Sequence, residues 1–162
     1  MLFVRRCSLF VTGGEQRTTI PEQRTMFSKY FTPEEANKRL PLVKQIVGDI
    51  FAKAAEIKAL NLYGNDPSKK PAYEKAFNQV NNLIEELESL GCFYKDWNFE
   101  KGLVDFPAMI EGEEVFLCWH SDEPDVRWYH SVEEGFPGRR PIPEYLLGNS
   151  DKKISVDSKD LA

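Results

Sequence analysis

Apolar side chains recur at spacings of four and three residues in two stretches of the chain, which predicts two amphipathic helices. The apolar positions of the first stretch are Ala36, Leu40, Val43, Val47, Ile50, Ala54 and Ile57. This helix is expected to begin after Thr32, because Thr32 and Glu35 have the spacing of a capping box and Pro33 suits the first helical position. Pro41 is expected to kink or break it, and the turn signal at residues 64–67 to end it.

The second stretch is expected to pack against the first as a long antiparallel helical hairpin resembling a short coiled coil. Its apolar positions are Ala76, Val80, Leu83, Leu87 and Leu90, and Gly91 stands where a left-handed cap belongs. Further apolar residues, including Ile46, Phe51 and Phe77, widen both stripes. Another layer must therefore cover the helices.

Three β-rich stretches, at residues 103–110, 113–120 and 125–130, supply that layer. Residues 111–112 suit a two-residue hairpin turn and residues 121–124 a longer turn. A three-stranded antiparallel meander packed on the helices, an α+β fold, is predicted.

The turn lengths fix a register, in which Ile110 pairs with Glu113 and His120 with Asp125. The side chains expected to face the helices are Val104, Phe106, Ala108, Ile110, Val115, Leu117, Trp119, Val126, Trp128 and His130. Those expected on the opposite face are Leu103, Asp105, Pro107, Met109, Glu114, Phe116, Cys118, His120, Asp125, Arg127 and Tyr129. This alignment decides which polar groups can meet.

Composition agrees with one folded domain: the chain has 162 residues, of which 41% are hydrophobic and 29% charged. Such a composition excludes wholesale disorder, and no apolar run approaches the roughly 20 residues of a membrane-spanning helix. The net charge of −5 argues against nucleic-acid and anionic-membrane partners. The cysteines, at positions 7, 92 and 118, form neither a disulfide framework nor a zinc-finger spacing, which favours a reducing, cytoplasmic location.

The expected organisation is a single α+β domain at residues 26–147 between two unlike ends. Residues 1–25 carry four arginines and two glutamates and do not match the rest of the chain, so they are interpreted as an extension or an upstream-start artefact. Residues 148–162 have no periodicity and are expected to form a disordered tail.

A metal site built from His120 and His130 is the first chemical candidate. On the predicted register the two histidines lie on opposite faces and at opposite ends of the second hairpin, about 15 Å apart. No metal site or cofactor is therefore expected.

The same register places Asp105, Cys118 and Arg127 in one cross-strand row. This row is either a surface ion pair of little energetic worth, or a shallow site in which Arg127 holds an anion and Asp105 or His120 moves a proton. Cys118 is interpreted as an inert buried thiol.

Residues 133–141 form the most specialised loop. Gly135 and Gly138 permit unusual backbone conformations, Phe136 is an apolar plug, and Arg139 and Arg140 offer donors for a phosphate or carboxylate. The alternative is a structural cap in which Phe136 is buried and one arginine pairs with an acidic group.

Several motifs together resemble a bacterial family of unknown function, DUF2203, over about residues 27–143. They are Tyr30-Phe31-Thr32-x-Glu34-Glu35-Ala36-Asn37, Gly102-Leu103-Val104-Asp105-Phe106-Pro107-Ala108, Leu117-Cys118-Trp119, Trp128-x-His130 and Gly135-Phe136-x-Gly138-Arg139. The resemblance implies no activity, cofactor or catalytic residue. It favours a start at Met26 and makes His120 a poorer candidate. The better candidates that it indicates are Asp105, Trp128, His130, Gly135, Gly138 and Arg139.

No recognisable catalytic motif is present, so the leading hypothesis is a non-enzymatic interaction or scaffolding module that forms a homodimer or binds a protein through its helices. The alternative is a small anion- or metal-binding protein or hydrolase with a site at the sheet edge and the loop from Gly135 to Arg140. The candidate ligand-binding residues of that site are Asp105, Arg127, His130, Arg139 and Arg140.

Overall fold

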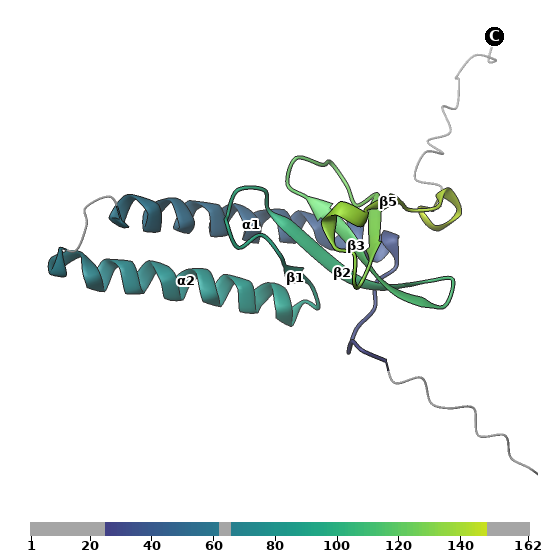
Figure 1. The fold of residues 1–162 in the computed structure, drawn as a ribbon, viewed down its shortest axis with the longest axis horizontal. Coiled ribbons are helices and arrows are strands. Elements are labelled where there is room, and N and C mark those ends of the chain that lie inside the picture. Colours follow the sequence, from purple (N-terminus) through teal and green to yellow (C-terminus); the bar gives the residue numbers. More distant parts are fainter. Residues whose placement is uncertain (1–24, 62–65, 149–162) are drawn as a thin grey trace, which may run out of the picture.

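The computed structural model describes residues 25–61 and 66–148 as a mixed α+β fold (Figure 1). Two helices, α1 (Pro33–Asn61) and α2 (Lys70–Ser89), precede a five-stranded antiparallel sheet. The strands are β1 (Phe93–Tyr94), β2 (Leu103–Ile110), β3 (Glu113–His120), β4 (Trp128–Ser131) and β5 (Arg140–Pro141). The predictions for residues 1–24 and 149–162 lie outside the described residues.

The start of α1 is the predicted capping box. The Thr32 amide donates to Glu35 Oε2 at 2.9 Å, and the Glu35 amide donates to Thr32 Oγ1 at 3.2 Å. The break expected at Pro41 does not occur, since α1 runs through it. Pro41 is exposed, while its neighbours Leu40 and Val43 are buried, and their burial stabilises the helix across this point. Packing thus outweighs the loss of one helical hydrogen bond.

The first strand pairing has the predicted register throughout. Ile110 pairs with Glu113 and Asp105 with Cys118, and the turn residues Glu111 and Gly112 have φ values of 53° and 85°. Positive φ at both positions is the conformation of a type I′ turn, which suits two-residue hairpins. Local chemistry therefore set this register.

The second strand pairing differs from the prediction by one residue. Cys118 pairs with Trp128 rather than with Arg127, and Phe116 pairs with His130. The expected strand at 125–130 begins only at Trp128, because Val126 is held by α1 instead: its amide donates to Asn37 Oδ1 at 2.8 Å. A one-residue slip exchanges the faces of a strand. His130 consequently joins the face opposite the helices, and Trp128 is 37% exposed, contrary to the prediction.

The sheet has five strands instead of three because two-residue strands flank the meander. β1 pairs with β2, and β5 pairs with β4. Two residues are too few to show an alternating pattern, so hydrophobic periodicity does not predict these strands. Ile142, the residue directly after β5, is buried in the same core as the helices.

The core lies between the helix pair and the inner face of the sheet. Trp119, Phe106 and Leu117 from the sheet and Val43, Val47 and Ile50 from α1 are its central members. α1 and α2 lie side by side, and their parts farthest from β1 extend beyond the sheet (Figure 1). No helix within the described ranges is long and apolar enough to cross a membrane.

Gly102 provides a test of how closely the layers pack. Its φ is +60°, and a Cβ atom there would lie 2.9 Å from Ser121 Cβ and 3.0 Å from Phe51 Cζ. Gly102→Ala is expected to lower the free energy of unfolding by about 2–4 kcal/mol, from left-handed strain plus overpacking. Gly112→Ala is the matched control, because its φ is +85° with no atom within 4 Å. Equal losses for both variants, measured by urea unfolding, would contradict this packing argument.

Candidate functional site

Three buried side chains from three adjacent strands converge on the outer face of the sheet. Asp105 on β2 lies opposite Cys118 on β3, and His130 on β4 is the diagonal neighbour of Cys118. Their ligand atoms (a carboxylate oxygen, the thiol sulfur and a ring nitrogen) all lie within 4.8 Å of one another. The exposed fractions of these residues are 4%, 1% and 2%. Polar groups this deeply buried require mutual partners or a bound ion.

The orientation of the His130 ring is fixed from both sides. Nδ1 lies 2.7 Å from the carbonyl oxygen of Ser131, to which it donates its proton, and Nε2 lies 3.3 Å from Asp105 Oδ1. A backbone acceptor on one ring nitrogen directs the other nitrogen at the cluster, as metal-binding histidines in proteins are commonly held. Nε2 can therefore either donate to Asp105 or ligate an ion.

Burial and hydrogen bonding together set the acid–base behaviour of the cluster. Burial lowers the pKa of His130, but hydrogen bonds to Asp105 and to the Ser131 carbonyl outweigh it, so the pKa of His130 is raised overall. Burial, with the Asp105 charge adding to it, raises the pKa of the Cys118 thiol. Cys118 is thus a poor nucleophile by itself, since the thiolate is the reactive form. A metal ion could still displace its proton.

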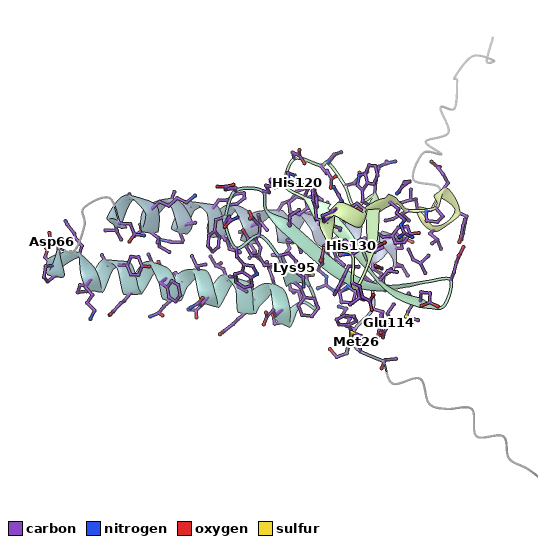
Figure 2. The ribbon with its side chains drawn as sticks, in the orientation of Figure 1. Met26, Asp66, Lys95, Glu114, His120 and His130 are labelled. Atoms are coloured by element: carbon purple, nitrogen blue, oxygen red, sulfur yellow. The ribbon has the colours of Figure 1, made fainter. Side chains whose placement is uncertain are left out.

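A pocket of about 210 Å³ opens onto the three side chains. Its apolar wall is formed by Leu103, Phe116, Val132 and Phe136. Lys95 also lines it and lies beside His130 (Figure 2). Phe27 packs over Phe116 with ring centroids 5.1 Å apart, so the segment before α1 helps to cover this face. The cluster is therefore buried but has access to a small cavity.

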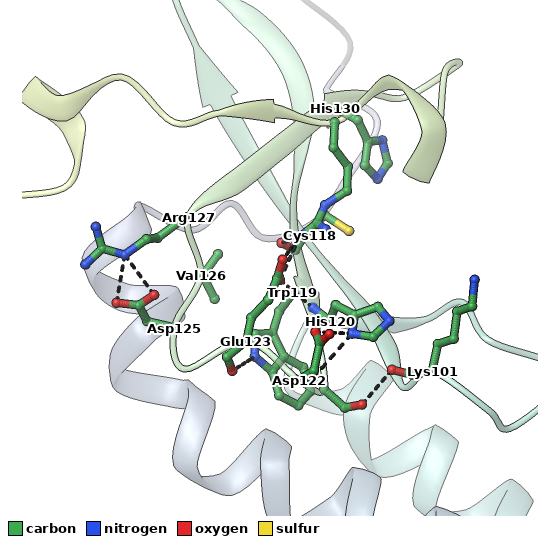
Figure 3. Close-up of polar contacts among 12 residues, drawn as sticks. Lys101, Cys118, Trp119, His120, Asp122, Glu123, Asp125, Val126, Arg127 and His130 are labelled. Atoms are coloured by element: carbon green, nitrogen blue, oxygen red, sulfur yellow. Dashed lines mark hydrogen bonds and ion pairs between the residues drawn. The ribbon is translucent and has the colours of Figure 1, made fainter.

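Arg127 and His120, two polar residues considered from the sequence, lie apart from the cluster. Arg127 pairs with Asp125 at 2.9 Å beside α1, away from His130 (Figure 3), and lines a separate groove of about 610 Å³. The predicted row of Asp105, Cys118 and Arg127 is therefore wrong. His120 forms an ion pair with Asp122. His130 pairs with Phe116, which lies four positions, or about 13 Å, from His120 along β3. The two histidines are therefore far apart even though they share a face.

The two loop arginines are engaged by carboxylates. Arg139 Nη2 donates to Glu123 at 2.6 Å and to the carbonyl oxygen of Cys118 at 3.2 Å. Arg140 pairs with Glu134 at 2.6 Å. Arg139 thus ties the 121–127 segment to β3 and supports the backbone of Cys118, as the cap interpretation expects of one arginine. Phe136, however, is 37% exposed and is not the buried plug of that interpretation.

Of the five predicted ligand-binding residues, the structure brings together only Asp105 and His130. The sequence reasoning missed Cys118 as their partner because the predicted register turned His130 inwards. One signal was available in the sequence: Asp105 and Cys118 were already paired by the correct first register. A buried acid opposite a buried thiol needs a third polar partner, which β4 supplies.

The fold and the cluster define a class: a mixed α+β protein with a buried carboxylate, thiol and imidazole beneath a small pocket. The chain belongs to the family described as uncharacterized conserved protein (DUF2203), which matches residues 29–142. That range contains all three residues of the cluster. No curated protein and no solved structure matches the chain.

Proposed function

We propose that this protein binds one divalent transition-metal ion, with zinc the best match, through Asp105, Cys118 and His130. The observation that carries the proposal is the convergence of these three buried ligand atoms within 4.8 Å at the floor of a pocket. This develops the metal-binding alternative considered from the sequence, with a different set of ligands.

The donor set selects the kind of metal. Oxygen, sulfur and imidazole nitrogen together suit zinc, whereas Mg²⁺ and Ca²⁺ prefer oxygen ligands alone. A tetrahedral zinc ion with bonds of about 2.0–2.3 Å holds its ligand atoms roughly 3.3–3.8 Å apart. Asp105 Oδ1 and His130 Nε2 are already 3.3 Å apart, and the three ligand atoms lie within 4.8 Å of one another. The distances between ligand atoms must therefore shorten by about 1 Å at most to hold the ion. Because all three residues line the pocket, a fourth ligand to the ion could enter from it.

The decisive experiment is equilibrium dialysis of the full chain against zinc, with the bound metal counted by mass spectrometry. The wild type is expected to hold one zinc ion per chain, and Cys118→Ala to bind it at least about 100-fold more weakly, because a ligand matters more than the outer groups whose loss costs 10–100-fold. Cobalt-loaded wild type should show thiolate-to-metal absorption that Cys118→Ala lacks.

Cys92→Ala is the matched control for this experiment. Cys92 is also a buried free cysteine, but it lies after α2 and away from the pocket, and burial raises its pKa to about 11. The variant should bind zinc as the wild type does. Equal zinc binding by Cys118→Ala and the wild type would exclude the proposed site.

A second proposal is the interaction module that the helical stripes suggested, associating with another copy through α1 and α2. Its support is the exposed Phe77, 49% accessible, which stacks on Tyr73 at 6.4 Å where α2 extends beyond the sheet. Sedimentation velocity at micromolar concentration tests it: a concentration-dependent dimer that Phe77→Lys dissociates is expected, and a monomer throughout would exclude it.

A further inference from the structure

The pocket above Asp105, Cys118 and His130 has a distinctive charge. Within residues 25–61 and 66–148, no carboxylate forms an ion pair with Lys95. Its ammonium instead lies 5.1 Å from the ring centre of Phe116 and 5.6 Å from that of Phe93. Cation–π contact holds an ammonium group in place but does not neutralise it.

The metal adds nothing to balance that charge. A divalent ion held by the Asp105 carboxylate, the Cys118 thiolate and a neutral His130 makes a cluster of zero net charge. Because of Lys95, the pocket then has a net charge of +1 beside an open coordination position. The occupant that complements both is a monoanion with an oxygen donor.

The other residues that line the pocket indicate the polarity and size of the rest of the ligand. Leu103, Phe116, Val132 and Phe136 are apolar, so the part of the ligand beyond its anionic group should be apolar as well. A volume of about 210 Å³ corresponds to roughly seven water-sized groups at about 30 Å³ each. The part of the ligand that lies inside the pocket is therefore small.

We propose that the pocket binds a small monocarboxylate, whose carboxylate reaches the metal and Lys95 while a short alkyl group lies against the apolar wall. This inference rests on the proposed metal site. It assigns Lys95 as the group that selects an anion.

Calorimetric titration of the zinc-loaded full chain with butanoate tests the inference. Butanoate is expected to bind, while butan-1-ol, which has the same alkyl chain without the charge, should not. Lys95→Met is expected to weaken butanoate binding about tenfold or more, the loss of one charge-assisted hydrogen bond. Lys29→Met is the control, since Lys29 also lies over a ring, that of Phe31 at 4.6 Å, outside this pocket.

The outcomes separate this inference from the metal site. Zinc binding with no butanoate binding, or with equal butanoate affinity in Lys95→Met and the wild type, overturns the monocarboxylate proposal and leaves the metal site standing. Absence of zinc binding overturns both. Butan-1-ol binding as tightly as butanoate would assign the pocket to neutral apolar ligands instead.

Discussion

His130→Ala is expected to lower the free energy of unfolding by about 3–5 kcal/mol in metal-free buffer. The variant leaves Asp105, which is 4% exposed, without the imidazole 3.3 Å away. A buried acidic group without its partner costs more than the pair itself contributes. Urea unfolding with a chelator present measures this loss without any contribution from bound metal.

A double-mutant cycle shows whether the loss comes from the pair. In an Asp105→Ala background the same His130→Ala change should cost less, by about 0.5–3 kcal/mol, because no acidic group remains to be left unpaired. His120→Ala is the matched control: its partner Asp122 is exposed, so a loss below about 1 kcal/mol is expected. Strictly additive losses at positions 105 and 130 would show that the two side chains are not coupled.

Asp96→Ala is expected to destabilise the protein by about 3 kcal/mol at neutral pH. The Asp96 carboxylate is 7% exposed and accepts hydrogen bonds from the amides of Asn98, Glu100, Lys101 and Gly102, at distances from 2.6 to 3.3 Å. Its loss leaves four donors of the segment between β1 and β2 without an acceptor. Asp66→Ala, which removes a single bond to the Ser68 amide, should cost about 1 kcal/mol and serves as the control.

The Asp96 contribution also depends on pH. Burial alone would raise the pKa of this carboxyl group, but its backbone hydrogen bonds outweigh burial, so the pKa lies below the ordinary 3.8. The unfolded chain therefore binds a proton more readily, and the stabilisation is complete above pH 3.8 and lost as the pH falls through the folded pKa. The difference in free energy of unfolding between the wild type and Asp96→Ala should become smaller below pH 3.8. An unchanged difference would contradict the role of the ionised carboxylate.

The site could be predicted from the sequence only as far as the two turns of the meander determine strand register. The turn at Glu111 and Gly112 is short and its residues adopt the required positive φ, so the pairing of Asp105 with Cys118 followed from local sequence. The 121–127 segment is longer, and turn chemistry alone does not fix its path. The pairing that placed His130 was therefore one residue in error.

Contacts distant in the sequence determine that path. Asn37 accepts from the amide of Val126 and donates to its carbonyl oxygen, across 89 positions of the chain. Arg139 meanwhile binds Glu123, whose carboxylate also accepts from the amide of His120 at 2.8 Å. Neither contact leaves a periodic signal in the sequence, since each depends on how the helix and the loop dock on the sheet.

The sequence by itself determined the two helices, the capping box, strands β2 and β3 with their pairing, and the membership in a family that the motifs indicated. These features arise from hydrophobic period and turn chemistry, which act over a few residues. Only the tertiary structure decided which face His130 occupies, because a register slip of one residue moves every side chain of a strand to the other face. The contacts that set the register come from α1 and from the loop after β4. The joining of Asp105, Cys118 and His130 is therefore a property of the folded chain.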